Sequence, residues 1–133
     1  MNIKRLVLTI IAVFIAANAL GFFLHAIWLQ ADYMLVSNLY RPEGEEKIVW
    51  IILGYLAFSI GAVWIYARGV ENRSWLGQGV RFGIALWLVL VIPTFFIDYA
   101  VQPIPLLLMA KLVLYEGISK VLLGILTAAL YRP

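Results

Sequence analysis

Four long apolar runs constrain this chain more than any other feature of its sequence. A transmembrane helix needs about 20 mostly apolar residues. The runs 6–29 and 48–67 contain no formally charged residue, and a third, 77–99, has an uncharged centre. A fourth, 104–130, is long enough as well but carries three charged residues. We therefore expect an all-α membrane protein. Its four transmembrane helices should cover roughly residues 5–30, 47–68, 77–99 and 104–130.

Composition agrees with this class. The chain has 133 residues, of which 65% are hydrophobic and 13% are charged, whereas a soluble domain is about half apolar and about a quarter charged. The links between the runs are short, so residues 1–133 are expected to form one transmembrane domain, an up-down bundle surrounded by the lipid bilayer. The net charge of +3 comes from basic residues at helix ends, and we expect no nucleic-acid partner.

The absence of cysteine excludes several kinds of functional site. It excludes disulfides, thiolate nucleophiles and cysteine metal sites. His25 is the only histidine, so a haem held by two histidines of one chain is excluded, and no carboxylate arrangement for zinc is recognisable. We therefore expect neither a metal nor another cofactor.

Most basic residues outside the apolar runs lie at one end of the predicted helices, and this asymmetry predicts how the chain is oriented in the membrane. Only Arg41 and Lys47 lie on the other side, together with most of the acidic residues. By the positive-inside rule, both termini and the second loop are cytoplasmic in a bacterial inner membrane. The first run is longer than the apolar region of a signal peptide, so we expect it to be retained. The basic residues of the first side are Lys4, Arg5, Arg68, Arg73, Arg81 and Arg132.

Two segments depart from the pattern of four regular helices. Residues 31–40 are largely apolar and either prolong the first helix or lie at the membrane interface, before Arg41-Pro42-Glu43-Gly44 breaks the chain. Pro93 lies inside the third predicted helix, where its ring frees the carbonyl of Val89 and predicts a kink.

The chain also resembles two repeated helical hairpins. An Asp-Tyr pair ends the first and third predicted helices, and two glycines seven residues apart punctuate the second and fourth. Such glycines lie on one helix face, where two backbones can approach closely. The alternative is chance similarity between apolar segments. The repeated features are Asp32-Tyr33 with Asp98-Tyr99, and Gly54 and Gly61 with Gly117 and Gly124.

Each predicted helix carries a polar edge, which should turn inward because lipid offers no hydrogen-bond partner. Glu116 and Lys120 stand one turn apart near mid-membrane, and we expect them to form an ion pair. The edges are Asn18, His25 and Asp32 on the first helix, Tyr55 and Ser59 on the second, Thr94, Asp98 and Gln102 on the third, and Lys111, Tyr115 and Ser119 beside Glu116 and Lys120 on the fourth.

Most of these polar residues fall in the outer half, so they are expected to line a vestibule that opens outward. We expect His25 to reach a polar group of another helix, with Asp98 or Lys111 as its first candidates. The alternative is that these side chains only hold the helices together by hydrogen bonds. The candidates for a ligand or ion pathway are His25, Asn18, Asp32, Asp98, Lys111, Tyr115, Glu116 and Lys120.

Several short motifs carry a resemblance across nearly the whole chain: His25 late in the first helix, Arg41-Pro42-Glu43, Pro103-Ile104-Pro105 and the final Tyr131-Arg132-Pro133. With them the chain resembles a group of small bacterial membrane proteins with four helices. The resemblance implies an all-helical inner-membrane protein, and implies no activity and no site residue. Small multidrug transporters also have four helices, but they carry a glutamate in the first, and residues 6–29 hold no acidic residue.

Three functional hypotheses remain open. The first is a non-enzymatic inner-membrane protein with a polar site between its helices, acting as an accessory or assembly component within a homo-oligomer or a larger membrane complex. The second is a small oligomeric transporter or channel for an ion or small molecule. The third is a membrane enzyme that uses His25 with Asp32 or Asp98, although no serine or threonine pattern marks a nucleophile.

Overall fold

The computed structural model describes all 133 residues, and the chain is 81% helical without strands. The first long helix consists of α1 (Ile3–Gly21) and the π-helical segment η1 (Phe22–Trp28). Short helices α2 (Gln30–Met34) and η2 (Ser37–Leu39) precede α3 (Ile48–Gly69). A continuous rod then comprises α4 (Trp75–Leu86), the π-helical η3 (Trp87–Val91) and α5 (Ile92–Val101), and α6 (Leu106–Leu130) ends the chain.

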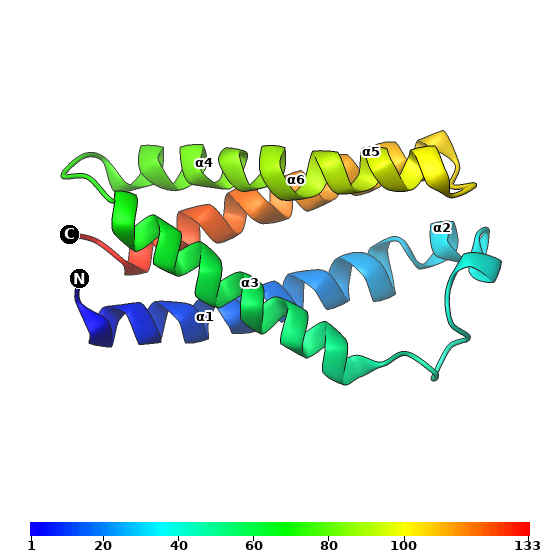
Figure 1. The fold of residues 1–133 in the computed structure, drawn as a ribbon, viewed down its shortest axis with the longest axis horizontal. Coiled ribbons are helices and arrows are strands. Elements are labelled where there is room, and N and C mark those ends of the chain that lie inside the picture. Colours follow the sequence, from blue (N-terminus) through cyan, green and yellow to red (C-terminus); the bar gives the residue numbers. More distant parts are fainter.

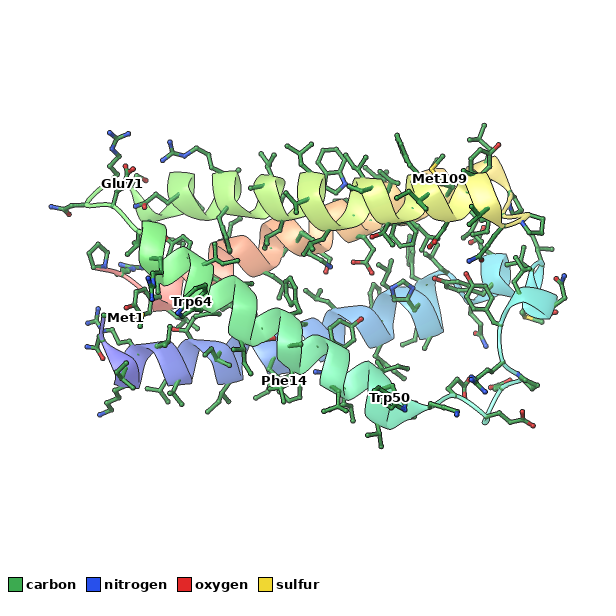
Figure 2. The ribbon with its side chains drawn as sticks, viewed as in Figure 1. Met1, Phe14, Trp50, Trp64, Glu71 and Met109 are labelled. Carbon is green, nitrogen blue, oxygen red and sulfur yellow. The ribbon has the colours of Figure 1, made fainter.

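Three of these helices are long and apolar enough to cross a membrane: Ile3–Trp28, Ile48–Gly69 and Trp75–Val101. Their outward side chains are mostly carbon (Figure 2), and Trp50 and Val89 are each at least 70% exposed. Such a surface suits a lipid environment, in which apolar side chains need not be buried. The fourth long helix, α6, has 25 residues and carries Lys111, Glu116 and Lys120.

The long helices alternate in direction (Figure 1). Both termini and residues 70–74 lie at one end, and residues 35–47 and 102–105 lie at the other. The helix α6 packs along the α4–η3–α5 rod and also against α1, whereas α3 crosses α1 and makes few contacts with α6. The helices therefore form an open series in which α6 is central, and α6 contributes the largest number of buried side chains.

Glycines bring α4 and α6 into close contact. A side chain at Gly124 would collide with the backbone of Gly79 and Gly83, and one at Gly117 would collide with the Trp87 ring. Gly54 and Gly61, by contrast, have no atom near enough to meet a side chain. The predicted close approach of two backbones is therefore right for Gly124 and wrong for Gly54 and Gly61, because α3 packs against α1 by a face that does not include them, and Gly117 meets a tryptophan ring instead.

After η1 the chain neither continues straight nor leaves the protein. At Leu29 the chain turns into α2, and Leu29 and Val36 pack with Ile104 and Leu108 in a buried apolar cluster. These contacts hold the first loop against the start of α6. Residues 31–40 thus do not prolong the first helix but fold back over the start of α6.

The predicted kink at Pro93 is absent, and α4, η3 and α5 form one straight rod (Figure 1). The π-helical η3 directly precedes the proline, and the Ile92 amide donates to the carbonyl of Trp87, five residues earlier. A π-turn inserts an extra residue into the helix. We attribute the straight path to this wider turn, which accommodates the proline ring and its missing N–H.

Candidate functional site

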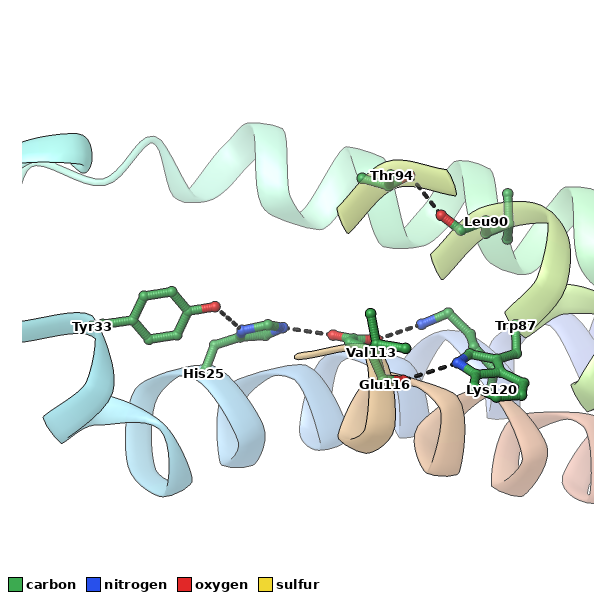
Figure 3. Close-up of polar contacts among 8 residues, drawn as sticks. All are labelled: His25, Tyr33, Trp87, Leu90, Thr94, Val113, Glu116 and Lys120. Atoms are coloured by element: carbon green, nitrogen blue, oxygen red, sulfur yellow. Dashed lines mark hydrogen bonds and ion pairs between the residues drawn. The ribbon is translucent and has the colours of Figure 1, made fainter. Parts of the chain in front are cut away.

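Four polar side chains form a hydrogen-bonded row between the end of the first long helix and α6 (Figure 3). His25 stands in the middle of η1, with Nδ1 2.6 Å from the Tyr33 hydroxyl and Nε2 2.6 Å from Oε1 of Glu116. Lys120 donates from Nζ to the other carboxylate oxygen, Oε2, at 2.7 Å. Residues 91 positions apart in the chain thus share one network.

With a neutral His25, every bond in this row can be satisfied. An ionised Glu116 accepts from Lys120 on Oε2 and from the Nε2–H of a neutral His25 on Oε1. The Nδ1 of His25 then accepts from the Tyr33 hydroxyl. The network fixes the hydrogen on Nε2, because a carboxylate only accepts, whereas the Tyr33 hydroxyl would accept from Nδ1 if His25 were protonated. Glu116 is therefore the common acceptor of the row, directly for Lys120 and His25 and through His25 for Tyr33.

Tyr33 is suited to be the terminal donor. It lies in α2, where burial raises the pKa of its phenol above the ordinary value of 10.0, and Tyr40 and Glu116 nearby raise it further. The phenol consequently stays protonated near neutral pH. Its ring also meets that of Tyr40 edge-on, with centroids 5.2 Å apart.

A second ion pair lies beside the row. Lys111 donates to Asp32 at 2.8 Å, and both line an open pocket of about 220 Å³ together with Trp28, Leu29 and Tyr115. The Tyr115 ring meets Trp28 edge-on at 6.1 Å. The ion pair of Lys111 with Asp32 joins α2 to α6 by charge as well as by packing, whereas Lys120 and Glu116 both belong to α6.

His25 does reach another helix, but its two expected partners were wrong. Lys111 pairs with Asp32, and Asp98 has no side-chain hydrogen bond or ion pair. The prediction that Asn18, His25 and Asp32 fall on one line, because they are spaced by seven residues, assumed a straight α-helix. The π-helical η1 and the turn at Leu29 change the direction of each later side chain.

Several other polar side chains stay out of the row because they bond to their own helix. Asn18 donates to Phe14, Ser59 to Tyr55 and Thr94 to Leu90, in each case to the carbonyl four residues earlier. Thr94 and Gln102 are exposed and Asp98 is half-buried, so the polar edge of the third helix lies largely outside the interior. A residue that sequence reasoning had not selected for the site, Tyr33, completes it instead. Its place directly after Asp32 was the available signal.

The row is partly exposed at His25 and nearly buried at Glu116 and Lys120. The side chain of His25 is 32% exposed, whereas those of Glu116 and Lys120 are 11% and 13% exposed. Beyond Lys120, whose ammonium lies 5.3 Å from the centre of the Phe58 ring, the core is mainly apolar and includes Val13, Ala17, Val63 and Leu123. It also contains the buried hydroxyl side chains of Thr9, Ser59 and Thr127.

The charged side chains do not form a metal site, because no three His, Asp or Glu residues are grouped to hold an ion. No protein-family model matches the chain, and no curated protein or solved structure is significantly similar to it. The chemistry of the site therefore has to be inferred from its own geometry.

Proposed function

We propose that this chain is a non-enzymatic protein of the bacterial inner membrane, with four membrane-crossing helices and both termini in the cytoplasm. Its function depends on a proton-exchanging polar site between the first helix and α6, reached from the outer face. In this role it is an accessory or assembly component of a membrane complex.

The observation that carries the proposal is His25 bonded on both ring nitrogens, to Tyr33 on one side and Glu116 on the other. A histidine held in this way can receive a proton at one nitrogen and release one at the other. An ionisable row in an apolar helical protein is costly, and intramembrane charges of this kind usually mark functional sites. If these hydrogen bonds served only to hold the helices together, the row would need neither a histidine nor one that is partly exposed.

The apolar core below Lys120 argues against a continuous path through one chain. Val13, Ala17, Val63 and Leu123 are almost completely buried and offer no hydrogen-bonding group. The buried hydroxyls of Ser59 and Thr127 donate to carbonyls of their own helices, so no chain of hydrogen bonds leads onward from Lys120 within a single copy. This one-sided access favours a site that responds to the outer compartment over a pore.

A small oligomeric transporter is the second candidate, because the pocket beside Asp32 and Lys111 is open and polar. In that case the onward route would lie between copies. Both candidates predict that His25 and Glu116 matter, and they differ in whether anything crosses the membrane.

Proteoliposomes under an imposed pH gradient distinguish the two. We expect the purified protein to carry no proton flux above that of protein-free vesicles, measured with a trapped pH-sensitive dye. In the same vesicles, ¹⁵N resonances of the single histidine should report the Nε2–H tautomer at neutral pH, and Glu116→Gln should change them. A flux that Glu116→Gln abolishes would establish the transporter. A free, averaging imidazole would overturn the proton-exchanging site.

A further inference from the structure

A second polar pocket lies at the opposite end of the molecule, near both termini. It has a volume of about 260 Å³ and lies where the end of α3, the loop after it and the first turns of α4 meet. Its polar lining comes from Tyr66, Glu71, Gln78 and Arg81. None of these residues belongs to the row around His25.

Tyr66 is the first sign that this pocket has an occupant. The residue is only 5% exposed, and its hydroxyl is the single buried side-chain polar atom without a hydrogen-bond partner. Its ring is held edge-on against Phe82, with centroids 5.2 Å apart. A buried polar group left unpaired costs about 1–3 kcal/mol, so native proteins rarely keep one without a ligand, a water or a functional reason.

Arg81 supplies the second sign, because its guanidinium has donors to spare. Its one hydrogen bond runs from Nε to the carbonyl of Gly77, at 3.4 Å, and it forms no ion pair. The acidic group of the pocket, Glu71, is engaged by Arg73 at 2.9 Å. Gln78 is fully used within the loop, since it accepts from the amide of Glu71 and donates to two carbonyls.

The pocket therefore offers unused donors on Arg81 and Tyr66, while its one acid, Glu71, already binds Arg73 through Oε2. A guanidinium pairs best with a carboxylate or a phosphate, and a phosphate has oxygens enough for a phenol as well. The setting favours phosphate chemistry. At the same end, Arg68 lies over the Trp64 ring and Arg132 over the Trp75 ring, each at 4.7 Å, which is the pairing of aromatic and basic residues expected at a headgroup layer.

We infer that the pocket between α3 and α4 binds a phosphate group through Arg81 and the Tyr66 hydroxyl. The phosphate is carried by an anionic lipid headgroup or is free in solution. The inference is independent of the site at His25, so either one can fail without the other.

Native mass spectrometry from a non-ionic detergent tests the lipid source directly. Short-chain phosphatidylglycerol is the probe, and the variants are Tyr66→Phe, Arg81→Gln and the charge-matched control Arg68→Gln. We expect wild type and Arg68→Gln to retain the lipid, and each pocket variant to bind it about tenfold more weakly. Tyr66→Phe keeps the buried ring and removes no protein hydrogen bond, so its lipid-free thermal stability should equal or exceed that of wild type.

Inorganic phosphate is the second probe, and it tests whether the pocket binds phosphate that is free in solution. Protection against heat by millimolar phosphate that Arg81→Gln removes would identify free phosphate as a source, and protection by the lipid alone would identify the headgroup. Equal losses in Arg68→Gln and Arg81→Gln would reduce the effect to net charge and overturn the proposal. Absence of binding to both probes would overturn it as well.

Discussion

At the scale of single residues, Glu116 holds the polar site together because two positive or donating side chains depend on it. Lys120 and His25 reach its two oxygens at 2.7 and 2.6 Å, from the same helix and from another one. Lys120 has no second carboxylate, only the face of the Phe58 ring. The three residues are therefore not equivalent, and loss of Glu116 strands more charge than loss of either partner.

We expect Glu116→Gln to lower the free energy of unfolding by about 3 kcal/mol, because it leaves a buried ammonium without its counter-ion. Lys120→Met should cost less, since Glu116 keeps His25 as a donor. The double variant should be more stable than Glu116→Gln alone. Thermal unfolding in detergent measures all three. Strictly additive losses would mean that water or another group already neutralises each charge.

Tyr33 connects stability to alkaline pH. Its folded-state pKa is raised above 10.0 by burial first and by Tyr40 next. Below that pH both folded and unfolded chains keep the phenolic proton, and the contribution is constant. Above it the unfolded chain loses the proton first, so stability should fall as pH rises.

Thermal unfolding between about pH 9 and 11 measures this decline. Tyr33→Phe should make the decline shallower, because it removes the group that resists ionisation. Tyr40→Phe is the variant for comparison. Burial and Asp98 raise the pKa of the Tyr40 phenol as well, although Tyr40 is more exposed than Tyr33. A Tyr33→Phe protein with an unchanged slope would show that this phenol ionises freely in the folded state.

At the scale of helices, the contact between α4 and α6 depends on the absence of side chains. Gly79 and Gly83 are one turn apart on α4 and meet Gly124 on α6. In lipid, helices associate largely by close packing of this kind, because the apolar effect that joins helices in water is weak there. The position of Glu116 opposite His25 follows from where this contact places α6.

We predict that Gly83→Ala destabilises the protein by about 2 kcal/mol, because the added methyl group meets the backbone of α6 at Val121. Gly77→Ala on the same helix is the matched control. Nothing lies within 4 Å of its new side chain, so it should be neutral or stabilise α4 by about 0.5–1 kcal/mol. Thermal unfolding compares the two. Equal effects would disprove the packing role of Gly83.

At the scale of the whole molecule, the two ends differ in charge. The end with both termini carries six basic residues, and the loop 35–47 at the other end holds Arg41 and Lys47 among acidic side chains. If the first end is cytoplasmic, the row at His25 faces outward and the pocket at Tyr66 faces inward. The proposed proton site and the proposed phosphate site would then serve opposite compartments.

Cysteine labelling tests this orientation without background, because the chain has no cysteine. In intact cells, a cysteine at Glu45 should react with a membrane-impermeant thiol reagent, and one at Asn72 should react only after the membrane is opened. Both native residues are exposed. The reverse pattern would invert the orientation and place the His25 site on the cytoplasmic side.

The sequence by itself determined those features that depend on neighbours along one helix. Long apolar runs predict helices because lipid leaves no other way to satisfy the backbone, and the helices appear where the runs lie. The pair of Glu116 and Lys120 followed from a spacing of four on one helix. Neither inference needs to know how one helix is rotated against another.

Only the tertiary structure decided which helices share their polar groups. The bond between His25 and Glu116 depends on the π-helical turn of η1 and on the glycine contact that sets α6 in place. The choice of Asp32 over Asp98 for Lys111 depends on the chain turning at Leu29. These are rotations and crossings between distant segments, and apolar sequences that face lipid carry little information about them, because many apolar side chains can occupy each such position equally well.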